Sequence, residues 1–541
     1  MITVSSVTGS IAVMISSTMV NVAIPSIMGA YGVEQTMAQW TATAFYAALV
    51  ASQLLNAWVV SAIGERAAFC SMLFFFTIGA FICATSTTIE VLIGGRIFQG
   101  IAAGILVPLN MSCLIAAFPE GRRGFAIGLY SMGTIVSPGF GPVIGGFAIE
   151  MFSWRHMFLV PLPMIGIAFI MGLFMLPHRT ASERRVRPFN WTGYALVMTA
   201  IICIVGAIGN GQRWGWGSDM TMITFLIGFV AMIAFLVSQL YVEEPILDPT
   251  LFKNAQFSSA VMVSFAFGAA TFGVNYAIPV MSQAVLSFTP IKAGAILIPA
   301  GCMLLILIPT AGWIADRVPN YIPIMIGCVI FSGAMFIISD SDVNTAFWTI
   351  ALLVMLSRFG HGIVKPNMGR ATLMAVPKEK LNQGIGTFNF IRQLGGAFGV
   401  SSIAVMIETR TAFHSDALAA TQTAANPTSQ EFLGKVEHLL GEAGVSSAVQ
   451  HSGALDYLGK VVYAQALTMG FQDAFMLLGV FFALMFFPCL ILRRAYIRAE
   501  ALGLPTKPKK RKKSAPEEDK KADSAEPAND GIQKPSPAAA E

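Results

Sequence analysis

Charge is scarce in this chain of 541 residues. Only 12% of its residues are Asp, Glu, Lys or Arg, whereas an average soluble domain carries roughly 25%. Hydrophobic residues make up 55% of the chain, and its mean hydropathy is +0.68. This composition excludes an ordinary soluble domain and predicts an all-α polytopic membrane protein.

Paired cysteines, metal-ligand spacings and a leader peptide are also missing. The seven cysteines fall inside apolar runs, so we expect packing residues and neither a disulfide nor a zinc site. No basic leader precedes the first apolar run, which predicts a retained helix rather than a signal peptide. No nucleotide-binding motif or nucleophile constellation supports an enzyme, and no metal or other cofactor is expected.

Apolar runs long enough to cross a bilayer number about fourteen, since each crossing needs about 20 apolar residues. Arg and Lys collect in the breaks near residues 65, 122, 179–187, 316 and 378. Because basic loops stay in the cytoplasm, both termini are predicted to be cytoplasmic and the protein to lie in the inner (plasma) membrane. The predicted spans are 7–29, 38–61, 66–86, 91–117, 123–150, 155–177, 191–209, 220–242, 258–286, 292–315, 321–339, 345–375, 382–408 and 471–494.

Two segments outside the spans have distinct compositions. Residues 503–541 are rich in Pro, Lys, Glu and Ala, which predicts disorder. Their KPKKRKK cluster fits anionic lipid headgroups better than nucleic acid, although solubility or positive-inside anchoring explains it more simply. Residues 409–470 form the one long outer loop and are expected to be partly helical and to lie at the membrane interface.

The stretch Ser131–Phe147, SMGTIVSPGFGPVIGGF, places Pro and Gly in a run that is otherwise apolar enough to cross a membrane. Gly133, Gly141 and Gly145 fall near one helix face and suit close packing against another helix. Pro138 and Pro142 should bend the same segment. The pattern predicts a bent helix at which two halves of a protein could rock, or a glycine packing face with no moving part.

Two distant parts of the chain repeat one pattern. Trp58 is followed by VVSA as Trp313 is followed by IADR, and Arg96 precedes Gly100 by four residues as Arg358 precedes Gly362. The spans from 38–61 to 123–150 therefore recur as those from 292–315 to 382–408, with two spans inserted between the halves. The predicted domains are 1–178 and 251–502, each a six-helix bundle, with inserted helices and linkers at 179–250 and the tail at 503–541. Such halves place a substrate site between them, near the midplane.

These residues resemble the major facilitator superfamily, in its fourteen-helix drug:proton antiporter branch of the EmrB/QacA type, over roughly residues 10–500. Arg96, Gln99 and Gly100 look like the family's Arg-x-x-Gln-Gly, often linked with proton transfer. Gly312, Asp316 and Arg317 look like the cytoplasmic gating motif. Further matches are the first-helix signature Thr18, Val20, Asn21, Val22, Ala23 and Pro25, the turn Trp154, Arg155 and Phe158, and the antiporter motif Gly133, Pro138, Gly139, Gly141, Pro142, Gly145 and Gly146.

The chain departs from this family by lacking acids. Ser16 and Ser61 stand where the family usually carries Asp. No Asp or Glu lies deep inside a predicted span, because Glu34, Glu65, Glu90, Glu150, Asp340 and Glu408 all lie near span ends. These losses weigh against proton coupling through a buried carboxylate and against a strong preference for cationic drugs.

Polar residues inside spans are candidate functional groups, because they are costly there. Arg358, His361 and Lys365 share one face of a helix and could attract an anionic group, with His361 as a titrating proton carrier; alternatively, Arg358 only snorkels or bonds carbonyl groups. Arg392 matches the family pattern in a structural or gating role. Neutral candidates for a substrate cavity, each of which could instead hold helices together, are Asn21, Gln53, Asn110, Asn275, Tyr276, Gln283, Asn367 and Asn389.

The resemblance and these residues together predict a secondary exporter of amphipathic, hydrophobic small molecules that works by alternating access and is driven by protons. In a cell with two membranes, the resemblance also implies a periplasmic adaptor and an outer-membrane channel as partners. Two alternatives remain: a lipid or anionic-metabolite transporter of the same fold, favoured by the missing acids, and a non-transporting membrane scaffold.

Overall fold

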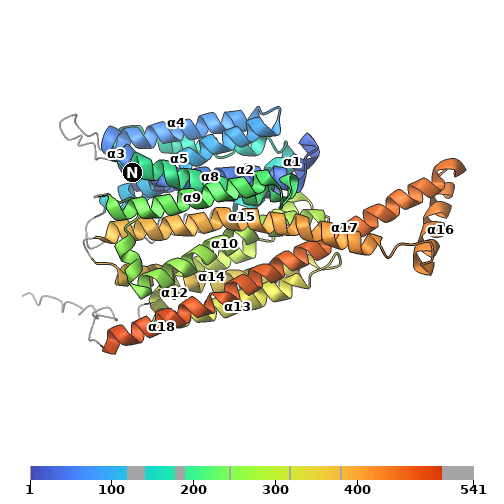
Figure 1. The fold of residues 1–541 in the computed structure, drawn as a ribbon. Helices are drawn as coiled ribbons and strands as arrows, with labels where there is room; N and C mark the ends of the chain where they lie inside the picture. The colour runs from blue at the N-terminus through green and yellow to red at the C-terminus, as the bar shows by residue number, and fades with distance from the viewer. Residues whose placement is uncertain are drawn as a thin grey trace, which may run out of the picture. The chain divides into compact units, whose positions relative to one another are not determined.

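A computed structural model of the chain describes residues 2–118, 140–176, 189–242, 245–315, 318–377 and 380–501. All regular secondary structure in these ranges is helical (Figure 1). Contacts divide the chain into one unit of Met1–Thr506 and a second of Lys507–Glu541. The second unit, which holds most of the predicted tail, lies outside the described residues.

The helices follow one another with short connections. They are α1 (Ile2–Tyr31), α2 (Gln35–Gln53), α3 (Asn56–Ile63), α4 (Glu65–Ala84), α5 (Ile89–Ala116), the helix Phe140–Met151, η2 (His156–Phe158), α7 (Leu162–Met175), α8 (Trp191–Trp214), α9 (Asp219–Tyr241), η4 (Pro249–Lys253), α10 (Ala255–Ala284), α11 (Pro290–Ala295), α12 (Ile298–Ala315), α13 (Tyr321–Ser339), α14 (Phe347–Ala375), α15 (Leu381–Ala419), α16 (Pro427–Glu442), α17 (Ser447–Leu484) and α18 (Phe486–Ala501).

Short polar side chains set several helix starts. The first turn of a helix has backbone N–H groups without intrahelical partners, and an Asn, Ser or Thr side chain at the N-cap satisfies one of them. Asn190 accepts from Gly193 N at the start of α8, and Asn254 accepts from Gln256 N at the start of α10. Gly215, at φ +87°, ends α8 in a conformation that favours glycine.

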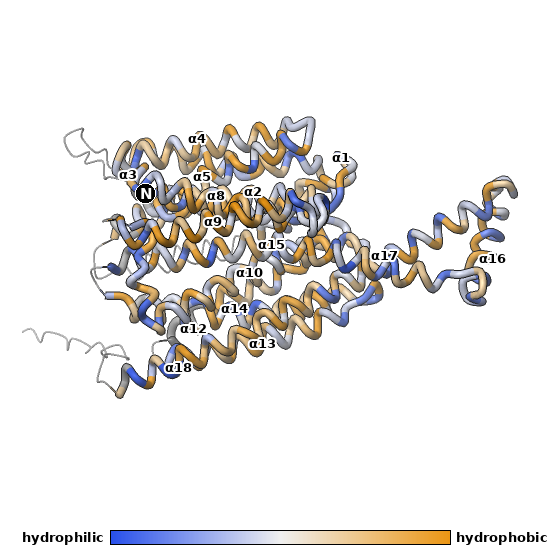
Figure 2. The backbone as a smooth tube through the Cα atoms, in the orientation of Figure 1, coloured by the Kyte–Doolittle hydropathy of each residue, from blue (hydrophilic) through white to orange (hydrophobic). Residues whose placement is uncertain are grey.

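Twelve helices among the described residues are long and apolar enough to cross a membrane. Figure 2 shows hydrophobic residues along the sides of these helices and hydrophilic residues at their ends and on α16. The all-helical membrane fold is thereby confirmed. The predicted span 38–61 is divided between α2 and α3, and 123–150 is described only as Phe140–Met151, so the count of fourteen stays a prediction.

The helices pack as two halves with equivalent pairings. We call residues 2–176 the N half and residues 255–501 the C half. In the N half α2 packs on α5, α4 on α5, and α1 on α7. In the C half α12 packs on α14, α13 on α14, and α10 on α18. The order of these helices along the chain is the same in both halves. The domain boundaries drawn from the sequence repeat stay a prediction.

Between the halves, α8 and α9 form a pair that packs against both of them. Helix α8 contacts α2 of the N half and α15 of the C half. Apolar side chains fill this junction: Val50 of α2, Val197 and Ile201 of α8, Phe235 of α9 and Phe390 of α15 form one buried cluster. The inserted helices therefore cover one edge of the contact between α2 and α15.

Three helices reach beyond the end of the bundle. Helices α15 and α17 run on past it, and α16 lies at the far end of α17 (Figure 1). The predicted outer loop 409–470 therefore extends away from the bundle, whereas the sequence suggested that it lies flat at the interface. We call the side of the bundle that carries α16 the α16 face, and the side where α1 begins and α18 ends the tail face.

Candidate functional site

The two halves meet along a seam where glycines allow backbones to touch. A Cβ atom built on Gly146 would lie 2.4 Å from the carbonyl oxygen of Pro290, the first residue of α11. A Cβ on Gly294 of α11 would lie 2.5 Å from the carbonyl oxygen of Pro142. Real Cβ atoms do not come so close, so both positions require glycine. The helix Phe140–Met151 thus packs on α11 through a reciprocal pair of glycines.

The same helix also packs closely on α1. A Cβ on Gly141 would lie 2.1 Å from Thr18 Oγ1, and one on Gly145 would lie 3.1 Å from the carbonyl oxygen of Met19. These glycines lie on one face, as their spacing predicts. Of the stretch that the sequence analysis singled out, Gly133, Pro138 and Gly139 lie outside the described residues. The remaining part lies at the seam between the halves.

Polar side chains cross the seam between α1, α2 and α10. Asn21 Nδ2 donates to the carbonyl oxygen of Asn275 (3.1 Å), and Gln283 Nε2 donates to the carbonyl oxygen of Val22 (2.9 Å). Tyr276 is fully buried, and its hydroxyl accepts from Gln35 Nε2 at 3.2 Å. The structure thus brings four predicted cavity residues, Asn21, Asn275, Tyr276 and Gln283, to the contact between the halves.

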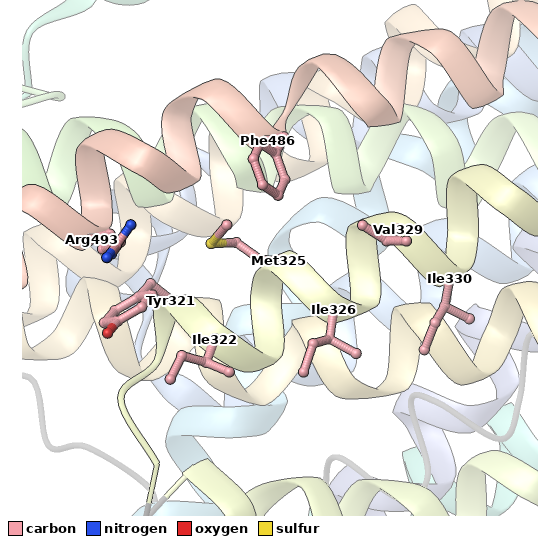
Figure 3. A pocket seen from close by; sticks show the side chains of 8 residues that line it. All are labelled: Tyr321, Ile322, Met325, Ile326, Val329, Ile330, Phe486 and Arg493. Atoms are coloured by element: carbon pink, nitrogen blue, oxygen red, sulfur yellow. The ribbon is translucent and has the colours of Figure 1, made fainter.

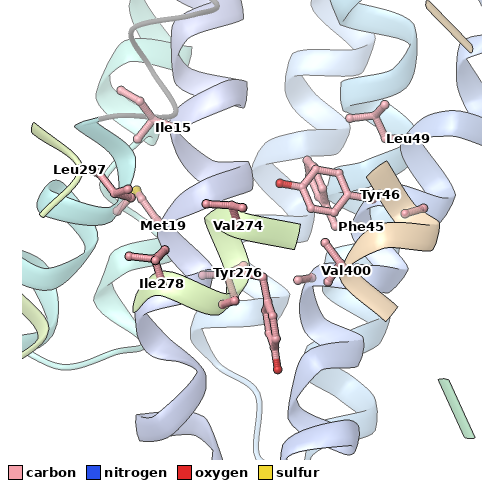
Figure 4. Packing of buried hydrophobic residues seen from close by; sticks show 14 of the residues in the cluster. Ile15, Met19, Phe45, Tyr46, Leu49, Val274, Tyr276, Ile278, Leu297 and Val400 are labelled. Carbon is pink, nitrogen blue, oxygen red and sulfur yellow. The ribbon is translucent and has the colours of Figure 1, made fainter. Parts of the chain in front are cut away.

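A second part of the seam joins α2 to α15. Thr43 and Ser401 are both fully buried, and their hydroxyl groups lie 3.2 Å apart. The rings of Tyr46 and Phe272, from opposite halves, meet edge to face at 4.6 Å. Apolar side chains fill the space around these contacts (Figure 4), among them Ile15 and Met19 of α1, Val274 and Ile278 of α10, and Val400 of α15. The seam is therefore well packed.

Arg96 and Gln99 form a buried unit inside the N half. Arg96 is fully buried; its Nε donates to the Thr41 carbonyl oxygen (2.9 Å) and its Nη1 to Gln99 Oε1 (2.8 Å). The guanidinium lies 4.2 Å from the ring centre of Phe45, a cation–π contact. Its Nη2 and the Nε2 of Gln99 are buried without a hydrogen-bond partner. This cation is held by neutral groups only.

The predicted stripe on α14 divides between two environments. Arg358 donates through Nη2 to Asn275 Oδ1, so a single hydrogen bond links it to a residue of the seam. His361 lies among aromatic rings, with Phe267 at 4.6 Å, Phe331 at 4.3 Å and Phe482 at 5.4 Å between ring centres. Its side chain is buried. The imidazole therefore lies inside the C half, among apolar rings.

Lys365 lies one helical turn further toward the tail face. Its side chain is half-buried, and the charge that acts on it is Arg392 of α15. Arg392 Nη2 also lies 3.5 Å from Asn389 Oδ1, while Asn389 Nδ2 donates to the Ile385 carbonyl oxygen of its own helix. Two cations from neighbouring helices thus act on one another.

The other predicted residues lie away from these groups. Asn110 donates to Ser10 Oγ at 2.8 Å and joins α5 to α1, and Asn367 donates to the carbonyl oxygen of Ile363 in its own helix. Gln53, the last residue of α2, has a buried Oε1 without a partner. Asp316 and Arg317 lie outside the described residues. In the described ranges no group of three His, Cys, Asp or Glu side chains could hold a metal ion.

A groove of about 510 Å³ lies on the outer surface of the C half, between α13 and α18 (Figure 3). Its walls are apolar, with Ile322, Ile326 and Val329 on α13 and Phe486 on α18, and Arg493 and Tyr321 lie at one end. None of the predicted site residues lines it. The groove is separate from the seam.

Sequence reasoning missed several seam residues. Gln35 precedes the predicted span 38–61, yet it begins α2 and bonds Tyr276. Thr43 and Ser401 look like ordinary hydroxyl residues that bond their own backbone. Glu408 was placed at a span end because the hydropathy falls there, whereas α15 continues to Ala419. A check of whether the helical pattern continues past residue 408 could have placed Glu408 inside a helix.

The fold and the seam define a multi-pass membrane protein of two equivalent helical halves. The Major Facilitator Superfamily profile matches residues 7–400, and the chain belongs to this superfamily. It is 28% identical over 432 residues to the multidrug export protein EmrB of Escherichia coli (strain K12), covering 79% of this chain and 83% of that protein.

Two further comparisons concern one relative and one solved structure. The chain is 26% identical over 474 residues to the fatty acid resistance protein FarB of Neisseria gonorrhoeae, which covers 86% of this chain and 91% of that protein. Among solved structures, a POT family transporter in complex with a thioalcohol-conjugated peptide matches with a TM-score of 0.63 at 13% identity, covering 91% of this chain and 95% of that chain. At this identity the match shows the fold alone.

Proposed function

We propose that this protein is a secondary exporter of amphipathic, hydrophobic small molecules that works by alternating access. The relatives named as multidrug export proteins support this proposal. The observation that carries it is the seam: a reciprocal glycine contact and polar bonds join the halves toward the α16 face, where Glu150 also accepts from the Ile291 backbone N–H at 2.7 Å. Breaking and remaking such contacts lets two rigid halves rock around a central site.

The tail face is proposed to be cytoplasmic, which places both termini inside the cell and the α16 face outside. The basic residues of the tail and of the breaks near 122 and 179–187 support this orientation through the positive-inside rule. Under this orientation the seam contacts seal the outer side. Asp316 and Arg317, as the family's gating motif, are proposed to lock the inner side.

Proton influx is proposed as the driving force. In this scheme the helix Phe140–Met151 is the hinge and seal, and Arg96 with Gln99 is the charge switch. The side chains of Arg358 and Lys365 supply charge to the substrate site. The unpartnered Nη2 of Arg96 supports the switch role, because it leaves a donor for a group that arrives in another state.

Inverted membrane vesicles with an imposed pH gradient test the proposal. Vesicles that contain the protein, acidic inside, should accumulate a fluorescent amphipathic dye, and collapse of the gradient should release it. Gly146→Leu is the matched variant, because its side chain would prevent contact with Pro290 and so closure of the outer seal. Transport that continues without the gradient would reject proton coupling, and transport by Gly146→Leu would reject the seam as the moving part.

An anionic amphiphile is a second candidate substrate, favoured by Lys365 and Arg392. Two cations that act on one another on neighbouring helices provide a place for a carboxylate or phosphate. The name of FarB, a fatty acid resistance protein, supports this candidate. Lys365→Ala should reduce efflux of an anionic dye more than that of a cationic dye, whereas His361→Ala, inside the C half, should change both alike. If Lys365→Ala reduces efflux of the anionic and the cationic dye equally, the anionic preference is ruled out.

The helices beyond the α16 face offer a surface for the periplasmic adaptor and outer-membrane channel that the family resemblance implies. Exposed apolar side chains there include Val449, Leu455 and Val461 of α17 and Leu439 of α16. A chain shortened to join residue 419 to residue 447 should still transport dye into vesicles but lose drug resistance in cells with two membranes. Unchanged resistance would reject this role.

A further inference from the structure

Glu408 of α15 is a carboxylate that the scheme above does not use. Its side chain is half-buried, and its Oε2 is buried without a hydrogen-bond partner. A carboxylate oxygen that is buried without a donor is costly when the group is ionised, whereas the neutral carboxylic acid is tolerated more easily. The geometry around Glu408 therefore favours the protonated form in this arrangement of the two halves.

The position of Glu408 links it to the seam. Its charge acts on Tyr276, whose hydroxyl accepts from Gln35 of the opposite half. The carboxylate that acts on Glu408 is Glu34 of the N half, the residue before α2, whose side chain makes no capping bond to that helix. Glu34 is the neighbour of Gln35, whose side chain bonds Tyr276 across the seam, so Glu34 and Glu408 lie on opposite sides of the seam. Two ionised carboxylates placed in this way repel each other.

The cations on the surrounding helices are engaged elsewhere. Arg410 and His414 of α15 both bond Asp473 of α17, the latter at 2.8 Å. Arg213 of α8 lies 3.8 Å from Met37 Sδ, and Arg358 of α14 bonds Asn275. Among the ion pairs of the described residues none involves Glu408, so these cations do not neutralise it directly.

We propose that Glu408 is a proton-binding site that controls the seam at the α16 face. With the proton bound, the seam closes as seen here. When the proton leaves, the carboxylate requires water and is repelled by Glu34, so the seam opens at this face. The inference rests on the proposed export function for its direction: a proton taken up from outside returns the emptied transporter to the state that is sealed on that side.

Glu150 provides the matched comparison. It lies at the same face and also bridges the seam, but its Oε1 accepts from the backbone N–H of Ile291, and the residue is exposed. A carboxylate that keeps a donor and contact with water loses little solvation when the seam closes. An amide oxygen can accept the same bond, so Glu150→Gln should preserve the pH response of the seam, which is the quantity compared with Glu408→Gln.

Distances between spin labels on the full chain in lipid nanodiscs test the proposal. Thr87→Cys and Val343→Cys, both exposed at the α16 face in opposite halves, carry the labels, with Cys203 and Cys302 replaced by Ser. The measurements run from about pH 5.5 to about pH 8.5, which brackets the physiological range. Rising pH should shift the population toward longer distances. One coupled proton changes the open-to-closed ratio by about tenfold per pH unit at most.

Glu408→Gln should hold the short distance at both ends of the pH range, and Glu34→Gln should weaken the response because it removes the repulsion. A pH response in Glu408→Gln equal to that of the unsubstituted chain, or no response in the unsubstituted chain, overturns the proposal. Dye transport in vesicles is read separately. Loss of transport with an intact pH response in the distances would refute the export function and leave the role of Glu408 standing.

Discussion

Two arginines at equivalent positions of the repeat differ in their hydrogen-bond partners. Arg96 of the N half is fully buried and bonds Thr41 and Gln99, both in its own half. Arg358 of the C half bonds Asn275, whose carbonyl oxygen accepts from Asn21 across the seam. The repeat has kept the residue type and the helix position while the partners have changed.

The difference shows how a duplicated fold can divide its tasks. The N-half arginine is a local unit, so its loss should mainly destabilise that half. The C-half arginine orients an asparagine that belongs to the seam, so its loss should act on the contact between halves. Stability and seam opening are therefore separate readouts that distinguish the two residues.

The largest expected effect is that of Arg96→Ala on stability. The substitution removes two short buried hydrogen bonds from a charged donor and a longer one to the Ser16 carbonyl oxygen. Each short bond is worth roughly 1.5–3 kcal/mol, so we expect a loss of about 3 kcal/mol or more in the free energy of unfolding. Arg358→Ala removes one such bond and should lose about half as much. Denaturant titration of the purified proteins, followed by helix content, measures both.

Spin-label distances across the α16 face complete this test. Arg358→Ala should raise the fraction of open seam, and Arg96→Ala should leave it nearly unchanged among the molecules that stay folded. Asn110→Ala, which removes a neutral bond between α5 and α1, serves as the control for a seam-independent loss within the N half. The comparison fails if both arginine variants open the seam equally.

An ion pair outside the membrane spans, in the connection to the C half, differs from the two arginines because its cation has a carboxylate partner. Asp248 is buried, and its Oδ2 lies 2.5 Å from Lys380 Nζ at the start of α15. Lys380→Ala would leave a buried carboxylate without its cation and should cost roughly 1–3 kcal/mol. Asp248→Asn leaves a half-exposed ammonium that water can solvate, and should cost about 1 kcal/mol or less. Thermal unfolding at pH 7 ranks the two variants.

The same pair predicts a pH dependence. Burial of the Asp248 carboxyl raises its pKa, but hydrogen bonds from Lys380 and Thr250 outweigh this effect and leave the pKa below its ordinary value. A lowered pKa in the folded state stabilises the fold above the ordinary pKa of about 3.9 and loses this contribution as the pH falls through the folded value. The difference in unfolding temperature between the unsubstituted chain and Asp248→Asn should stay constant from about pH 7 to about pH 5. It should shrink below about pH 4, where the carboxyl begins to bind a proton.

A carboxylate placed beside Arg96 would sharpen the difference between the two arginines, because Arg358 bonds a neutral asparagine. The carbonyl oxygen of Ser16 lies 3.5 Å from Arg96 Nη1, and the Ser16 side chain is buried. Ser16→Asp should pair with Arg96, with a coupling energy of about 1 kcal/mol in a double-mutant cycle with Arg96→Met. It should also raise efflux of cationic dyes relative to anionic ones. A coupling energy of zero would mean that the two side chains do not meet.

Much of the fold could be predicted because bilayer physics leaves few choices. Apolar runs of sufficient length must be helices, and the repeat around Arg96 and Arg358 predicted two halves. The glycines at 141, 145 and 146 indicated close helix contact, and the structure shows what they contact, α1 and Pro290. Their spacing predicts a smooth face but carries no information about the partner.

The seam partners could not be predicted for the same reason. Whether Asn21 bonds a substrate or the backbone of Asn275 depends on how the halves dock, which a single chain's periodicity does not specify. His361 shared a helix face with Arg358 and Lys365 in the sequence pattern, yet three aromatic rings from α10, α13 and α17 surround it. Side chains on one face of a long helix meet different neighbours along its length.

The smallest expected effect is that of removing the hydrogen bond between the Thr43 and Ser401 hydroxyl groups in the middle of the seam. Thr43→Val keeps the shape and removes one partner of Ser401, and a neutral bond of this kind is worth about 1 kcal/mol. Ser401 can turn its hydroxyl to a carbonyl group of its own helix, so the loss should be below that value and the double variant Thr43→Val with Ser401→Ala should be no worse. Because the bond crosses the seam, the small loss should appear as easier opening in the spin-label distances, while the denaturant midpoint stays within error. An effect as large as that of Arg96→Ala would contradict the division of tasks between the halves, since a neutral pair at the seam would then stabilise the fold as much as a buried cation does.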